Sequence, residues 1–218
     1  MIAKPTRSIG GGSGIHKIAF DDKEYWLDRN KVKRDELKNV VSTWEEYIIV
    51  DFVKQAKYSE AIYSETTNSI RVITAMRKNG ECEVLLAFHR FGSDMSKPVD
   101  NISSGGLVAL VDLDTGKLGK AKRKIDPEIM HSVHPDSKSQ IEGVQITNWE
   151  HIKDKLLHVH RCFPYYTFLA WDVVVSEKES PFILEINRGS DLGIQMIKPL
   201  RSEKLGVFMR EYGLLDNR

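Results

Sequence analysis

Three oxygen-bearing side chains near the end of the sequence, Asp172, Glu185 and Asn187, are of the types that bind a hard metal ion. Two carboxylates and an amide oxygen on one surface repel each other and lose hydration unless a cation lies between them. Such ligands suit Mg²⁺, which commonly takes one or two protein carboxylates and completes its coordination with water and nucleotide phosphates. An ordinary edge hairpin with an exposed Asp and Glu has the same pattern, so both interpretations stay open here.

The elements that would position these side chains are two short strands. Apolar runs over 169–175 and 182–186 flank a polar turn, 176–181, that ends in proline, and this arrangement predicts a β-hairpin. Side chains alternate along a strand, so the last two of the three candidates share a face. Pairing of the strands about the turn would bring the first candidate opposite them.

A second group of residues with chemical potential lies at the start of the chain. Lys4-Pro5 leads into Thr6 to Gly14, a loop with four glycines and two serines. Successive backbone N–H groups in such a loop can wrap phosphates, and a nearby lysine adds a point charge. No Gly-Lys-Ser/Thr sequence opens a helix after it, so it is not a P-loop. A flexible linker has the same composition, and the loop alone does not separate the two.

A strongly apolar run follows, Tyr47 to Val53, with one acid within it, Asp51. The run predicts a buried strand that leads out of one lobe. The carboxylate either faces solvent or hydrogen-bonds a nucleotide ribose or base.

Two arginines accompany the next predicted hairpin. Its strands cover 68–76 and 81–90 and turn at Lys78-Asn79-Gly80. Arg71 lies near its beginning and Arg90 at its end. Surface strands often carry arginine, but together these two could clamp an anion.

Composition narrows the class of protein. The chain has 218 residues, enough for one sizeable domain or two small lobes, and 32 Lys and Arg against 31 Asp and Glu leave a net charge of +1. Nucleic acid and an anionic membrane are therefore not indicated, and the Lys120 to Lys124 run is most simply a solvated face. The two cysteines lack a metal-site or disulfide spacing. With no apolar run long enough to span a membrane and no signal peptide, we expect a cytoplasmic protein.

Taken in chain order, the features resemble those of the ATP-grasp superfamily. The matching residues are Lys4-Pro5 with Gly10 to Gly14, Tyr47 to Val53, Asp172, and Glu185-Ile-Asn187. The sequence looks most like the sugar-transfer-associated or alpha-L-glutamate-ligase-related branch, through Asn68 to Thr74, Val99 to Gly106, His134-Pro-Asp136 and Trp171 to Ser176. The similarity covers most of the chain.

The resemblance implies an α+β fold in which two lobes with antiparallel sheets enclose a nucleotide cleft. Residues 1–55 would form the small nucleotide-covering lobe and 56–218 the larger lobe with the metal site. Family members usually carry a further region ahead of the Lys-Pro strand. We therefore expect a fragment, a split-gene product or a minimal version, with a partner chain or homo-oligomer completing the cleft.

The resemblance also assigns roles to individual positions. Residues that would contact ATP are Lys4 at its α/β phosphates, Gly10, Gly11, Gly12, Ser13 and Gly14 folded over them, and Val50, Asp51, Phe52 and Val53 at the adenine. Those that would hold Mg²⁺, or Mn²⁺ in its place, are Asp172, Glu185 and Asn187. Those nearest the chemistry would be Arg71 and Arg90, steadying the transferred phosphate, and Arg188, bordering the acceptor site.

The chemistry implied is an ATP-dependent ligation through an acyl-phosphate. A small carboxylate substrate would be phosphorylated and then joined to an amine or hydroxyl acceptor, in polysaccharide or amino-acid-conjugate biosynthesis by association with the branch. Positioning and charge neutralisation dominate such chemistry, which explains the lysine, arginine and carboxylate types. The alternatives are a phosphotransferase on the same fold and a non-catalytic nucleotide-binding module.

Overall fold

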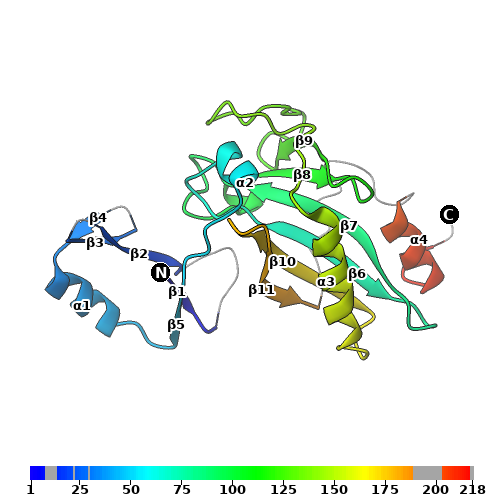
Figure 1. Ribbon diagram of the computed structural model, residues 1–218, viewed down its shortest axis with the longest axis horizontal. Coiled ribbons are helices and arrows are strands. Elements are labelled where there is room, and N and C mark those ends of the chain that lie inside the picture. Colours follow the sequence, from blue (N-terminus) through cyan, green and yellow to red (C-terminus); the bar gives the residue numbers. More distant parts are fainter. Residues whose placement is uncertain (8–13, 22, 29, 189–202, 217–218) are drawn as a thin grey trace. The chain divides into compact units, whose positions relative to one another are not determined.

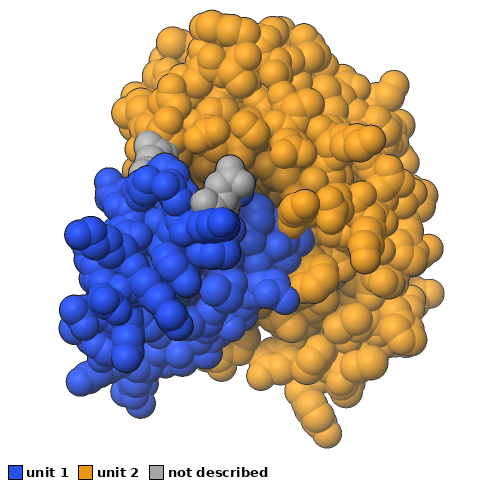
Figure 2. Space-filling model, turned by 60° about the vertical axis from the view of Figure 1, so that its left-hand side comes forward, with its two compact units in different colours: residues 1–53 blue, residues 54–218 orange. Residues whose placement is uncertain are grey.

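A computed structural model describes residues 1–7, 14–21, 23–28, 30–188 and 203–216. The chain forms two compact units, Met1–Val53 and Lys54–Arg218, which Figure 2 colours separately. The boundary lies two residues before the one expected from the sequence. Each unit combines an antiparallel sheet with at least one helix, so the predicted α+β class is confirmed.

The first unit is a five-stranded antiparallel sheet with one helix. Its elements are β1 (Ile2–Pro5), β2 (His16–Asp21), β3 (Glu24–Leu27), β4 (Asn30–Val32), α1 (Arg34–Ser42) and β5 (Tyr47–Val50), and the strand order is β4-β3-β2-β1-β5 (Figure 1). Strands β2 and β3 form a hairpin, with Asp21 opposite Glu24.

Strand β5 corrects one prediction. The apolar run at Tyr47 was expected to be a buried strand, but β5 is an edge strand, and Ile48, Ile49 and Val50 are 43%, 50% and 40% exposed. An apolar run specifies a strand without specifying its neighbours. A strand paired on one side only can leave large aliphatic side chains in solvent.

The second unit is built on a six-stranded antiparallel sheet in the order β11-β10-β6-β7-β8-β9 (Figure 1). Its strands are β6 (Ile70–Met76), β7 (Cys82–Phe91), β8 (Leu107–Val111), β9 (Leu118–Arg123), β10 (Phe168–Val175) and β11 (Pro181–Asn187). Its helices are α2 (Lys57–Ile62), the 3₁₀ turn η1 (Ile102–Ser104), α3 (Trp149–Arg161) and α4 (Lys204–Glu211). Within the described residues, no helix has the length and apolar character needed to cross a membrane.

Helices cover both faces of this sheet. On one face α3 packs Ile152 and Leu156 against residues such as Trp171 of β10. On the other face α4 packs Leu205 and Phe208 over the middle of β6 and β7. Burying a large aliphatic or aromatic side chain contributes about 2 kcal/mol. The two helices therefore hold the sheet rigid. The charged side chains described below lie on the face that α4 covers only in part.

The inward stripe of α3 contains a histidine that the sequence did not place in the core. Trp149, Ile152 and Leu156 are buried on the inner side of the helix, and His160 is fully buried as well. Its ring nitrogens contact Thr74 Oγ1 at 2.7 Å and the Tyr166 carbonyl at 2.8 Å. Because both nitrogens are satisfied, the imidazole is tolerated in the core.

The β8–β9 turn depends on a glycine that lies against α3. Gly116 has φ +74°, and a Cβ there would come within 2.6 Å of Trp149 Cβ. We predict that Gly116→Ala lowers the free energy of unfolding by about 3 kcal/mol, since left-handed strain and overpacking add.

A matched control is Gly143→Ala, where φ is +79° and the added Cβ meets nothing within 4 Å. This variant keeps the strain without the clash and should lose about 1 kcal/mol. Urea denaturation measures both variants. Equal losses would contradict the packing of Gly116 against Trp149.

Candidate functional site

The two strands of the C-terminal hairpin pair as the sequence predicts. Asp172 of β10 lies directly opposite Glu185 of β11, and Ala170 lies opposite Asn187. Directly paired residues share a face of an antiparallel sheet. The Asp, Glu and Asn side chains therefore lie on one face, next to an irregularity in the ladder after Asp172.

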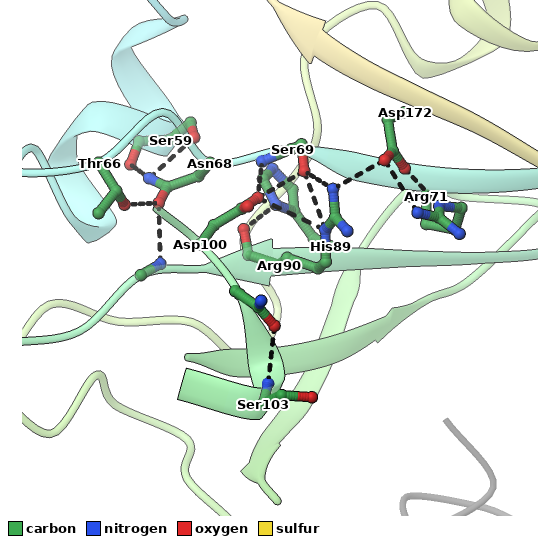
Figure 3. A network of polar contacts seen from close by, with 12 residues as sticks. Ser59, Thr66, Asn68, Ser69, Arg71, His89, Arg90, Asp100, Ser103 and Asp172 are labelled. Carbon is green, nitrogen blue, oxygen red and sulfur yellow. Dashed lines mark hydrogen bonds and ion pairs between the residues drawn. The ribbon is translucent and has the colours of Figure 1, made fainter. Parts of the chain in front are cut away.

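Asp172 is buried between two arginines (Figure 3). Arg71 lies opposite it on β6 and binds it with both Nε and Nη2, the latter 2.8 Å from Oδ2. Arg90 of β7 adds a contact from its Nη2, 3.2 Å from Asp172 Oδ2. Only 5% of Asp172 is exposed. Removing one partner of a buried ion pair typically costs 3–5 kcal/mol, so the three groups depend on each other.

Arg90 is held from its other side by a serine and a second carboxylate (Figure 3). Its Nε lies 3.0 Å from Ser69 Oγ and 3.5 Å from Asp100 Oδ2. Asp100 in turn accepts hydrogen bonds from the Ser69 backbone N–H and hydroxyl. The guanidinium is thereby fixed between Asp100 and Asp172.

The carboxylates around Arg90 determine its protonation state. Burial alone would lower the pKa of Arg90, but the carboxylates of Asp100, Asp172 and Glu185 outweigh burial and raise that pKa above its ordinary value. Arg90 therefore stays cationic. Three carboxylates surround two guanidinium groups, and Glu185, the outermost, is exposed.

His89 fixes the backbone of Arg90 from the opposite face of the sheet. Tyr58 Oη lies 3.0 Å from His89 Nε2, and His89 Nδ1 lies 3.0 Å from the Arg90 carbonyl. A neutral ring that accepts from Tyr58 and donates to the carbonyl satisfies both contacts. Burial lowers the pKa of His89 to about 3, so this neutral form persists at neutral pH.

A buried amide ties β6 to β7 behind the arginines (Figure 3). Asn68, just before β6, accepts hydrogen bonds at Oδ1 from Thr66 at 2.7 Å and from the Gly92 N–H at 3.1 Å. Its Nδ2 donates to the Tyr63 carbonyl at 2.7 Å. Because Ser69 follows Asn68 and Gly92 closely follows Arg90, this network sets the spacing of the Ser69–Arg90 contact.

The donor set at the hairpin fits a divalent cation by its chemistry. Asp172, Glu185 and Asn187 offer two carboxylates and an amide on one face. Asn187 Nδ2 is buried and has no hydrogen-bond partner among the described residues; this donor cannot bind a cation itself, but it suits an oxygen acceptor such as water or a phosphate beside the site. No three His, Cys, Asp or Glu side chains in the described part of the chain form a metal site. The amide is therefore needed for this set.

Two of the residues of the first unit that are expected to contact the nucleotide, Lys4 and Val50, lie on the same sheet face. Lys4 of β1 pairs with Ile48, and Val50 pairs with Ile2, so these side chains lie on one face of the β1–β5 ladder. Asp51, Phe52 and Val53 follow the strand, and Asp51 is exposed. The face thus combines a lysine with partly exposed aliphatic side chains.

The glycine-rich loop lies only partly within the described residues, whereas Arg188 lies within them. Gly10, Gly11, Gly12 and Ser13 lie outside them. Gly14 has φ +76°, and a Cβ there would lie 3.0 Å from both Pro5 and Tyr47, so a larger residue does not fit readily. Arg188, directly after β11, is exposed, and the turn that follows it lies outside the described residues.

Asp100 and Ser69 are members of this cluster that the sequence interpretation missed. They lie 31 residues apart, and neither spacing nor periodicity links them. One sequence feature could have identified Asp100: it is a carboxylate at the start of a loop of small residues, Val99 to Gly106, that leads into β8. Such a loop can approach a buried arginine closely.

Two α+β units, each built on an antiparallel sheet, agree with the architecture expected of an ATP-grasp protein. The family model described as sugar-transfer associated ATP-grasp matches residues 1–203, and the chain belongs to this family. Proteins of the ATP-grasp class bind ATP and typically a divalent metal, and they are generally ATP-dependent ligases or transferases. No curated protein matches the chain.

The neutral state of His89 predicts a specific acid sensitivity. Its pKa of about 3 in the folded chain lies below the ordinary value of 6.5, so below pH 6.5 the unfolded chain binds a proton that the folded chain does not. Stability present at neutral pH is therefore lost as the pH falls toward 3, by up to about 1.4 kcal/mol per pH unit.

The variant His89→Gln removes this titration, and its stability should fall less steeply with acid than that of the native chain. Denaturant unfolding at several pH values measures the difference in slope. His158→Gln, at an exposed position of α3, is the control and should keep the native slope. Parallel profiles for the native chain and His89→Gln would show that His89 is not buried in its neutral form.

Proposed function

We propose that this protein is an ATP- and Mg²⁺-dependent ligase that joins a small carboxylate to an amine or hydroxyl through an acyl-phosphate. One observation carries the proposal: Asp172 and Glu185 occupy paired positions on one sheet face, beside two partly buried arginines. Cation ligands next to fixed positive charges suit a polyphosphate, whose oxygens bind both.

The proposed roles follow from the charges at the site. Asp172, Glu185 and Asn187 would hold the divalent ion, which neutralises phosphate charge when bound. Arg71 and Arg90 lie one and two strands further along the same sheet and would stabilise the transferred phosphoryl group. Ser69 and Asp100 fix Arg90 in place, so its guanidinium would not need to reorient during the reaction. Charges that are already oriented stabilise a transition state most effectively.

The first unit supports nucleotide binding independently. Lys4 shares a sheet face with Ile48 and Val50, so that face offers a cation for phosphates and aliphatic surface for a base. Lys4 would contact the α/β phosphates, the 10–14 loop would cover them, and Val50 to Val53 would contact the adenine. Arg188 would border the acceptor site.

The proposed reaction has two steps, phosphorylation of the carboxylate and transfer of the acyl group. A carboxylate oxygen of the substrate attacks the γ-phosphorus, a P–O bond to the leaving ADP breaks, and an acyl-phosphate forms. The amine or hydroxyl of the second substrate then attacks the acyl carbon and loses its proton, and inorganic phosphate leaves. Neither step needs a protein nucleophile, and the family name favours a product in polysaccharide or amino-acid-conjugate synthesis.

Metal binding is tested with Glu185→Gln, because this side chain is exposed and the substitution leaves the buried ion pairs intact. A ligand at about 100 times its Kd stabilises the native chain by about 2.7 kcal/mol. We predict that Glu185→Gln loses more than half of the thermal shift that Mg²⁺ adds to ATP, while the shift with ATP and EDTA is unchanged.

The matched control is Glu177→Gln, an exposed glutamate in the turn of the same hairpin. It should keep the full Mg²⁺-dependent shift. A full shift in Glu185→Gln as well would remove Glu185 from the metal site.

The reaction class is tested by trapping. With ATP, Mg²⁺, hydroxylamine and a panel of carboxylates, a ligase gives hydroxamate and ADP, because hydroxylamine captures the acyl-phosphate. Arg90→Gln should lower hydroxamate formation on the order of 100-fold. Arg161→Met, at an exposed position of α3, should retain it.

Two outcomes would contradict the ligase. A phosphorylated product that survives hydroxylamine would indicate a phosphotransferase. ATP binding without ADP release, for every carboxylate and acceptor tried, would indicate a nucleotide-binding module without catalysis.

A further inference from the structure

Gln55, at the start of the second unit, has a buried side chain with both of its polar atoms in use. Only 7% of the residue is exposed. Its Nε2 donates to the Thr66 carbonyl at 2.9 Å and to the Tyr63 carbonyl at 3.2 Å. Its Oε1 accepts from the Asn68 N–H and from the Ser59 hydroxyl, both at 3.0 Å. Four hydrogen bonds therefore fix the amide and the loop that surrounds it.

The backbone at Gln55 is bound to the β10–β11 hairpin, which carries the proposed metal ligands. Gln55 forms an antiparallel bridge with Ser176, in the turn of that hairpin. The next N–H, that of Ala56, donates to the Val175 carbonyl at 2.7 Å. The pairing of β6 with β10 reaches only to Ile70, and this segment takes the place of β6 beside the remainder of β10. The glutamine is therefore held in a fixed position relative to the hairpin.

The side chain of Gln55 reaches the other half of the candidate site through Asn68. Asn68 lies beyond the last β6–β10 pair, so a side chain and not a strand accepts from its N–H, and Gln55 Oε1 is that acceptor. The Asn68 Oδ1 in turn holds the Gly92 N–H at 3.1 Å. The next residue, Ser69, has its hydroxyl 3.0 Å from Arg90 Nε. Gln55 therefore sets the position of Ser69 through Asn68.

We propose that Gln55 is a positioning residue for Arg90 in the phosphoryl-transfer step, a role that rests on the proposed ligase function. Gln55 fixes Asn68 and thereby Ser69. Ser69 and Asp100 then fix the Arg90 guanidinium. Because the backbone of the same glutamine is bound to the hairpin with the metal ligands, one residue sets the arginine relative to the acids. Misplacement of a reacting or charged group by about 1 Å can lower a rate on the order of 100-fold.

The alternative is that Gln55 only satisfies the backbone of the loop before β6. Ser59 separates the two roles, because it is buried to a similar degree. Its hydroxyl donates to Gln55 Oε1 and lies 3.4 Å from Asn68 Nδ2, but it does not hold the Asn68 N–H. Loss of this hydroxyl removes buried hydrogen bonds of the same network and leaves the Gln55–Asn68 contact in place. Ser59→Ala is therefore the matched control.

The first measurement is hydroxamate formation by the full chain with ATP, Mg²⁺, hydroxylamine and the panel of carboxylates. Gln55→Met removes all four hydrogen bonds at a similar volume, and Gln55→Asn keeps an amide that is one methylene too short to reach Asn68. We expect each variant to lower kcat on the order of tenfold, with the KM for ATP unchanged within about twofold. Ser59→Ala should keep the native kcat.

The second measurement does not require activity. The Arg90 Nε–H gives a ¹H–¹⁵N NMR signal, which is assigned by its loss in Arg90→Gln. Because this N–H donates to the Ser69 hydroxyl, its signal should move in both Gln55 variants and stay in place in Ser59→Ala. Circular dichroism shows whether each variant folds.

A double-mutant cycle tests whether Gln55 acts through Ser69. Ser69→Ala should lower kcat, and adding Gln55→Asn to it should lower kcat no further, because the link is already broken. Additive losses overturn the proposal, as do equal losses in Ser59→Ala, and so does a native kcat with an unmoved Arg90 signal in the Gln55 variants. Failure of both Gln55 variants to fold would show a purely structural role and overturn it too. Absence of hydroxamate from the native chain would instead contradict the ligase, and the Arg90 signal would still decide the role of Gln55.

Discussion

The second unit depends on the burial of Asp172 between Arg71 and Arg90. Three charged groups are largely removed from water at one end of a sheet whose central strands are packed on both faces. Desolvation of each group costs several kcal/mol, and only the mutual contacts compensate for it. A protein built for stability alone would fill this position with apolar residues. We propose that the charges are kept there because they bind a ligand.

The surroundings are arranged to keep that cluster in place. Ser69 and Asp100 fix the Arg90 side chain, His89 holds its backbone, and Asn68 joins the strands that carry both arginines. Each of these contacts is local, but together they give a charged site with two guanidinium groups held in a defined geometry. Electrostatic preorganisation of this kind is what phosphoryl transfer requires, because the protein contributes little covalent chemistry.

Sequence reasoning succeeded where interactions are local and failed where they are not. The hairpin of Asp172 and Glu185 was predictable because a six-residue turn and strand alternation set its register. The pairing of Arg71 with Asp172 was not, since 101 residues separate them. The burial of individual residues could not be predicted from the sequence either. The apolar run of β5 is an exposed edge strand. His160 is a core residue, because Thr74 and Tyr166 satisfy its ring nitrogens. In each case the missing information was the identity of a neighbour distant in sequence.

The central claim is that the face bearing Asp172, Glu185 and Asn187 holds a divalent ion with ATP. It is tested most directly by NMR of the ¹⁵N-labelled protein with a non-hydrolysable ATP analogue and Mn²⁺ in place of Mg²⁺. A bound paramagnetic ion broadens nearby signals. The account predicts that the Asn187 side-chain amide signal disappears on addition of Mn²⁺, while that of Asn79, in the turn at the other end of β6, persists. An Asn187 signal that stays as sharp as that of Asn79 would contradict it.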